Sequence, residues 1–169
     1  MSTASAGMTP QECLRRASVE GACEAAQSYG DELSEAVKHR QLTSFEKDYL
    51  ALHIAQNYLS VMGVIDLLSF QPQIFVRIIE LAKQYEAETL LPLLTAACRC
   101  LDLTEDASAN EIAEKIARWH GGAVTAGSDQ LTIIQEDIFD RFRADGDQEW
   151  AAMMMRFIST EANEQTGEC

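Results

Sequence analysis

Residues 42–70 read LTSFEKDYLALHIAQNYLSVMGVIDLLSF, and this stretch decides the fold. Thr43 can cap a helix, Glu46 stands three positions later to complete a capping box, and Leu42 occupies the position of a hydrophobic staple. The residues that follow are apolar on almost every side of a helix, and such a helix must be buried. With further helical patterns up to residue 101, the stretch predicts a buried central helical block.

Helix signals continue on both sides of this block. Thr9-Pro10 and Ser108-Ala109-Asn110-Glu111 are typical helix starts, and Asp145-Gly146-Asp147 predicts a turn before the last helix. No alternation typical of a strand is sustained, so we expect an all-α bundle of about seven or eight helices. The predicted organisation is a flexible N-terminus over 1–8, a single helical domain over 9–160 and a flexible acidic tail over 161–169. The predicted core includes Leu50, Ile54, Leu68, Phe75, Ile79, Leu94 and Trp150.

The charge of the chain is strongly acidic. It has 27 acidic and 13 basic side chains, a net charge of −14, and residues 102–169 hold fifteen of the acids but five of the bases, or −10. Direct binding to nucleic acid depends on Lys and Arg that displace counterions from phosphates, so nucleic acid is a poor partner. A basic protein is the better one.

Cysteine usage and hydropathy indicate the compartment. The five cysteines are odd in number and show no framework spacing, which favours a reducing cytoplasm. The longest apolar run contains Asp66 and falls short of the uncharged span of about 20 residues that a membrane crossing needs. We therefore expect a soluble cytoplasmic protein without membrane contact.

The sequence carries no recognisable catalytic or metal-binding motif. His53 is expected to be a core or boundary histidine with a hydrogen-bond partner, and Cys98 and Cys100 point to different faces of a helix, which disfavours zinc. Aligning Gly146 with the glycine of a calcium loop places arginines at two ligand positions. We expect no enzymatic activity, no metal and no cofactor.

The positive signal is a row of carboxylates in the second half of the chain. On a helix, carboxylates three or four residues apart lie about 5–6 Å from each other. This distance is close to the spacing of phosphates along a nucleic-acid strand. The alternative is that these acids are only the wet face of an amphipathic helix. The predicted partner-binding acidic face comprises Asp129, Glu136, Asp137, Asp140, Asp145, Asp147 and Glu149, with Glu111 and Glu114 as further candidates.

From about Leu42 to Thr160 the chain resembles the bacterial DNA-mimic protein family, small acidic all-helical inhibitors of DNA-binding proteins. The resemblance rests on the start at Leu42-Thr-Ser-Phe-Glu46, on Val61-Met-Gly-Val-Ile-Asp-Leu-Leu-Ser-Phe70, on the pair Ile78-Ile-Glu-Leu-Ala82 and Leu90-Leu-Pro-Leu-Leu94, and on Ile138-Phe-Asp-Arg-Phe142. The family's asparagine-glycine-glycine-phenylalanine turn is reduced to Gly63 here. The resemblance implies a homodimer that occupies the DNA-binding face of a regulator or nuclease.

Two other functions remain open. An immunity or antitoxin protein would neutralise a cognate bacterial toxin with the same charge, and a phage-encoded inhibitor of a defence complex would share the surface. The apolar surplus of the central block also predicts a homodimer through residues 62–75, or an interface there with a partner.

Overall fold

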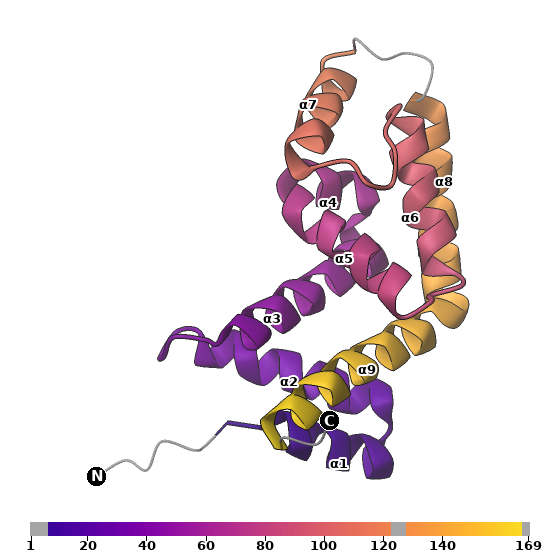
Figure 1. The fold of residues 1–169 in the computed structure, drawn as a ribbon. Helices are drawn as coiled ribbons and strands as arrows, with labels where there is room; N and C mark the ends of the chain where they lie inside the picture. The colour runs from indigo at the N-terminus through magenta and orange to yellow at the C-terminus, as the bar shows by residue number, and fades with distance from the viewer. Residues whose placement is uncertain (1–6, 123–127, 167–169) are drawn as a thin grey trace. The chain divides into compact units, whose positions relative to one another are not determined.

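The computed structural model describes residues 7–122 and 128–166, and it confirms the all-α class (Figure 1). These residues contain no strand. Their helices are α1 (Pro10–Glu20), α2 (Ala22–Ala36), α3 (Ser44–Asn57), α4 (Val64–Phe70), α5 (Pro72–Gln84), α6 (Leu90–Cys100), α7 (Ala109–His120), α8 (Ser128–Arg141) and α9 (Asp147–Thr166), with π-helical segments η1 (Tyr58–Met62) and η2 (Phe142–Gly146). Among them, none combines the length and the apolar character that crossing a bilayer would require.

The chain divides into two compact units. Unit 1 consists of residues 1–53 and 150–169, and unit 2 of residues 54–149. Both boundaries fall inside helices, α3 and α9, so no linker in the sequence marks them. The expectation that residues 9–160 fold as one domain stays a prediction, and α9 continues to Thr166, past the expected end at residue 160.

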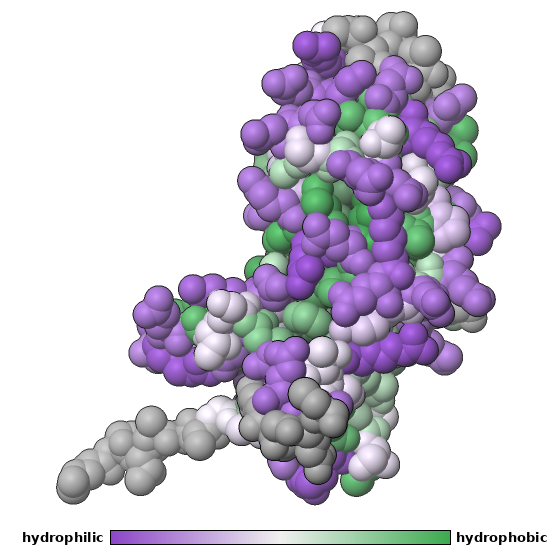
Figure 2. Space-filling model, in the orientation of Figure 1, coloured by the Kyte–Doolittle hydropathy of each residue, from purple (hydrophilic) through white to green (hydrophobic). Residues whose placement is uncertain are grey.

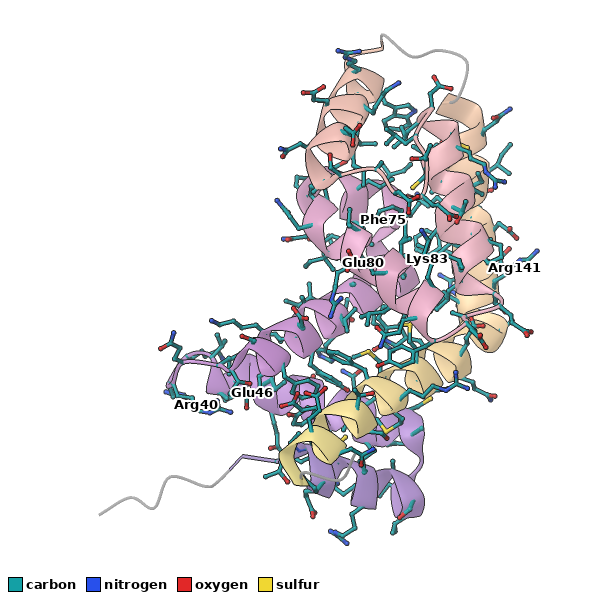
Figure 3. All side chains as sticks on the ribbon, in the orientation of Figure 1. Arg40, Glu46, Phe75, Glu80, Lys83 and Arg141 are labelled. Carbon is teal, nitrogen blue, oxygen red and sulfur yellow. The ribbon has the colours of Figure 1, made fainter. Side chains whose placement is uncertain are left out.

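Three helix starts read from the sequence, at Thr9, Thr43 and Ser108, are confirmed. The Thr43 hydroxyl accepts a hydrogen bond from the Glu46 N–H at 3.2 Å, and the Glu46 carboxylate accepts one from the Thr43 N–H at 2.8 Å. Ser108 and Glu111 form the same reciprocal box at the start of α7, and Thr9 caps α1. The Glu46 carboxylate also pairs with Arg40 (Figure 3), and this hydrogen bond lowers the pKa of Glu46. Capping depends on residues within one turn, which is why the sequence alone predicts it.

Unit 1 is built around an aromatic core. The rings of Tyr29 and Tyr49 meet edge to face with centroids 4.7 Å apart, and the Tyr49 hydroxyl donates a hydrogen bond to the Ala26 carbonyl at 2.9 Å. Phe45 packs on Phe157, with ring centroids 5.0 Å apart, which joins α3 to α9 within this unit. Aromatic pairs of this kind stabilise by about 0.5–1.5 kcal/mol beyond the area they bury.

A close approach of α2 and α3 in unit 1 gives a testable prediction. A Cβ at Gly30 would collide with the imidazole of His53, which is 6% exposed and lies 3.3 Å from Asp31. Inside a helix, glycine to alanine normally stabilises by about 0.5–1 kcal/mol, whereas overpacking costs about 1–3 kcal/mol. We therefore expect Gly30→Ala to lower the free energy of unfolding, measured by denaturant titration of the full chain.

The control uses the same glycine in a different background. In a His53→Ala chain the added methyl group has room, so Gly30→Ala should there be neutral or stabilising. An equal loss in both backgrounds would show that the two helices do not meet at His53. The burial of His53 confirms it as a core histidine; Asp31 is a close neighbour at 3.3 Å, and the expected hydrogen bond stays a prediction.

Unit 2 is a helical bundle in which α6 lies along α8, while α4 and α5 pack against α7 (Figure 1). Its core contains four of the expected residues of the central block and further side chains from α7 and α8. The buried set includes Leu68, Phe75, Ile79, Leu94, Ile116 and Ile138. Trp150, also expected in a core, is buried in unit 1.

The central block is not a continuous buried helix. After α3 the backbone widens into η1 and then breaks at Gly63, whose φ is +113°, before α4 begins. Two expected core residues are therefore corrected: Ile54 is 38% exposed and Leu50 is only half-buried. A second correction concerns residues 145–147, where η2 leads directly into α9 in place of the expected turn.

Candidate functional site

The outward side of α8 carries the centre of the predicted acidic face. Leu131 and Ile138 are buried, which directs this side of α8 into the bundle. Glu136 and Asp140 are exposed, as is Ile133, and their spacing of three and four residues places them together on the opposite side. Hydrophilic side chains gather over the outer edges of α7 and α8 in Figure 2.

The acids of this side differ in their partners. The Arg141 guanidinium donates a hydrogen bond to the Asp137 carboxylate at 3.2 Å, and both side chains are about half exposed (Figure 3 shows Arg141 on α8). Glu136 and Asp140 make no hydrogen bond or ion pair with any residue that the structure describes. Among the described acidic side chains of α8, Glu136 and Asp140 are therefore the two that remain available to another molecule.

Helix stability does not explain this arrangement. Like charges four residues apart on a helix destabilise it by about 0.2–0.5 kcal/mol, and no cation of the described residues forms an ion pair with Glu136 or Asp140. A helix side that is only solvated could equally carry alternating acidic and basic residues. The pair is consistent with a surface that meets positive charge supplied from outside the chain.

Glu149 has a different role from the one predicted. Its carboxylate accepts hydrogen bonds from the backbone N–H groups of Thr89 and Leu90, both at 2.9 Å, at the start of α6. These N–H groups have no partner inside α6, and a helix N-terminus favours negative charge. Glu149 therefore fixes α6 within unit 2, and its carboxylate is already engaged.

The remaining predicted residues fall into two groups. Glu111 and Glu114 are exposed on α7, but Glu111 completes the cap with Ser108, and the hydrogen bond from the Ser108 hydroxyl lowers the pKa of Glu111. The side chains of Asp129, Asp145 and Asp147 lie outside the described residues. Of the predicted face, the structure brings together Glu136, Asp137 and Asp140.

An open pocket of about 410 Å³ adjoins the acidic side of α8. Thr89, Asp140, Arg141 and Ala144 line it, so it lies between the start of α6 and the end of α8. Its walls combine one carboxylate and one guanidinium. A shallow, open pocket of this composition lacks the apolar enclosure typical of a small-molecule site.

One pair of side chains resembles a nucleophile with its base. The Ser69 hydroxyl lies 2.9 Å from His120 Nε2. The same hydroxyl donates its proton to the Ile65 carbonyl at 2.7 Å, so it can only accept from the imidazole. A histidine that donates to a serine cannot take the serine's proton, and this geometry therefore does not activate Ser69.

Cys98 and Cys100 likewise show no reactive setting. Burial raises the pKa of the Cys98 thiol to about 11, and Cys100 is half-buried. A thiol with a raised pKa is a poor nucleophile and metal ligand. Among the described residues, no group of three or more His, Cys, Asp or Glu side chains is arranged to hold a metal ion.

Unit 2 exposes large apolar side chains, of which Met62 and Phe70 lie in the predicted interface segment 62–75, whereas sequence reasoning missed Val61 and Ile133. Val61 is 73% exposed, Met62 51%, Phe70 67% and Ile133 62%. For Val61 the signal in the sequence was Gly63, since a glycine inside a helical pattern can end the helix and change which sides are buried.

Comparison of the chain with family models, with curated proteins and with solved structures finds no match.

Proposed function

We propose that this chain is a non-enzymatic binding protein whose acidic α8 side replaces nucleic-acid phosphates on a basic, nucleic-acid-binding protein and thereby inhibits it. The observation that carries the proposal is the pair Glu136 and Asp140. Both side chains are exposed, they are four residues apart, and neither forms an ion pair with a cation of the described residues. The regulator, nuclease or defence complex that it inhibits would supply the missing positive charge.

The charge of the whole chain supports the same function. Unit 2 holds sixteen of the acidic and seven of the basic side chains, a balance of −9 within the total of −14. Such a field raises the rate at which a basic protein arrives, and salt weakens it because the Debye length falls from about 10 Å at 0.1 M to about 3 Å at 1 M. The association rate should therefore fall steeply with salt, while dissociation should change less.

Charge reversal tests the proposal. The partner is recovered from the native host by pull-down and salt elution, and its affinity is measured for Glu136→Lys/Asp140→Lys. We expect binding to weaken about tenfold or more, since like charges then face each other across the interface. The melting temperature should stay nearly unchanged, because both groups are exposed.

A matched control separates local charge from total charge. Glu24→Lys/Glu164→Lys changes two exposed glutamates of unit 1 and alters the net charge by the same amount. Equal loss of affinity in both variants, or no loss in either, would refute a specific role for the α8 side. The proposed function also requires that this protein displaces nucleic acid from the partner.

Neutralisation of a basic bacterial toxin is the alternative function. It is favoured by Ile133, which is 62% exposed three residues before Glu136. A phosphate backbone presents no such apolar group, whereas protein interfaces are built around apolar contacts with a polar rim. A partner that loses catalytic activity without binding nucleic acid would support this alternative over DNA mimicry.

A further inference from the structure

Two consecutive large apolar side chains are exposed where α3 ends. Val61 and Met62 are the last residues of η1, and they are 73% and 51% exposed. Single exposed apolar residues are common, whereas contiguous exposed apolar surface favours contact with another molecule. π-Helical segments, moreover, occur frequently at functional sites.

The fold of unit 2 holds this pair in place beside α8. The Gln135 side chain of α8 accepts a hydrogen bond from the Ile65 N–H at 3.2 Å, just after Gly63. Gly63 has φ +113° and ψ 156°, a conformation that only glycine adopts readily. η1 packs on α8, the start of α4 is tied to the same helix by the Ile65 hydrogen bond, and in this arrangement Val61 and Met62 are exposed.

The two carboxylates without a described partner lie on the exposed side of α8, beyond Gln135. Successive residues are about 100° apart around a helix. Gln135 therefore stands between the buried stripe, marked by Leu131 and Ile138, and Glu136, which is one step further from the core. Asp140 follows one turn later. The η1–α8 surface, defined as Val61, Met62, Glu136 and Asp140, combines an apolar pair with two carboxylates.

Charge decides between two molecules that could bind this surface, a second copy of the chain and a basic segment of another protein. Residues 54–76 contain a single charged residue, Asp66, and no base. A second copy of the chain carries −14 and would bring its own carboxylates to this surface. A basic segment meets no like charge there.

We infer that the η1–α8 surface binds a cationic amphipathic segment, in which large apolar side chains stand among lysines or arginines. The apolar side chains cover Val61 and Met62, and the cations pair with Glu136 and Asp140. The inference rests on the proposed function and adds to it that the partner is recognised by apolar contact as well as by charge.

Two peptides test the inference directly. One is a short lysine-rich helical peptide with leucines on one side, and the other has the same charge with serine in place of each leucine. We expect the full-length protein to bind the leucine peptide about tenfold or more tightly than the serine peptide, because burying apolar side chains is favourable. Val61→Ser/Met62→Ser should abolish this preference and leave binding of the serine peptide unchanged.

The control is Val19→Ser/Val37→Ser, which changes two exposed valines of unit 1 and should keep the preference. A preference that survives Val61→Ser/Met62→Ser, or no preference in the unaltered protein, overturns the inference. The inference can fail in this way while Glu136→Lys/Asp140→Lys still abolishes binding of both peptides. That result would keep the proposed recognition by charge and remove only the apolar contact. A dimer in sedimentation that becomes a monomer in Val61→Ser/Met62→Ser would instead assign the surface to a second copy.

Discussion

Replacing Leu68 by alanine is expected to lower the free energy of unfolding by about 2–5 kcal/mol. Leu68 lies on α4 and is completely buried in the core of unit 2. The loss combines the transfer free energy of the removed atoms with the cavity that remains, since a bundle of packed helices collapses only partly. Denaturant titration of the full chain measures it.

Phe70 on the same helix is the matched control. It is 67% exposed, so Phe70→Ala removes more atoms but should change stability by no more than about 0.5 kcal/mol. A loss below about 1 kcal/mol for Leu68→Ala would contradict its burial. The comparison separates the side of α4 that faces the bundle from the side that faces solvent.

Replacing Gly63 by alanine is expected to destabilise the chain by about 2–4 kcal/mol, through backbone strain and a disturbed hydrogen bond. An L-residue is strained at φ +113°, and the new Cβ would collide with the amide of Gln135, which accepts from the Ile65 N–H. Thermal and denaturant unfolding both report the loss.

A double-variant cycle separates the two causes. Gln135→Ala removes the collision but also the hydrogen bond, so Gly63→Ala should cost less in that background, and the remainder measures the backbone strain. Fully additive losses would show that Gly63 and Gln135 do not meet. Since Gly63 also orients η1, the Gly63→Ala chain should lose the preference for the leucine peptide.

Much of the candidate site could be read from the sequence, and the reason is local. Helical spacing identifies the buried side of α8, with Leu131 and Ile138, and its solvent-exposed side, with Glu136, without any knowledge of the fold. Whether an acid is available is a different question, because it depends on groups that are distant in sequence. Glu149 was predicted on the acidic face, yet its partners are the N–H groups of Thr89 and Leu90, about sixty residues earlier.

By itself, the sequence determined the helical class, the helix starts and the acidity of the second half, since each depends on composition or on residues within one turn. The caps at Thr43 and Ser108 illustrate this. Only the tertiary structure decided which apolar residues are buried. Val61 and Met62 look like core residues in a run that is apolar on every side, but the break at Gly63 and the contact from Gln135 to Ile65, seventy residues apart, leave them in solvent. Burial is a property of the packed bundle. When a helix is apolar on every side, no local sequence pattern indicates which side will pack against the rest of the bundle.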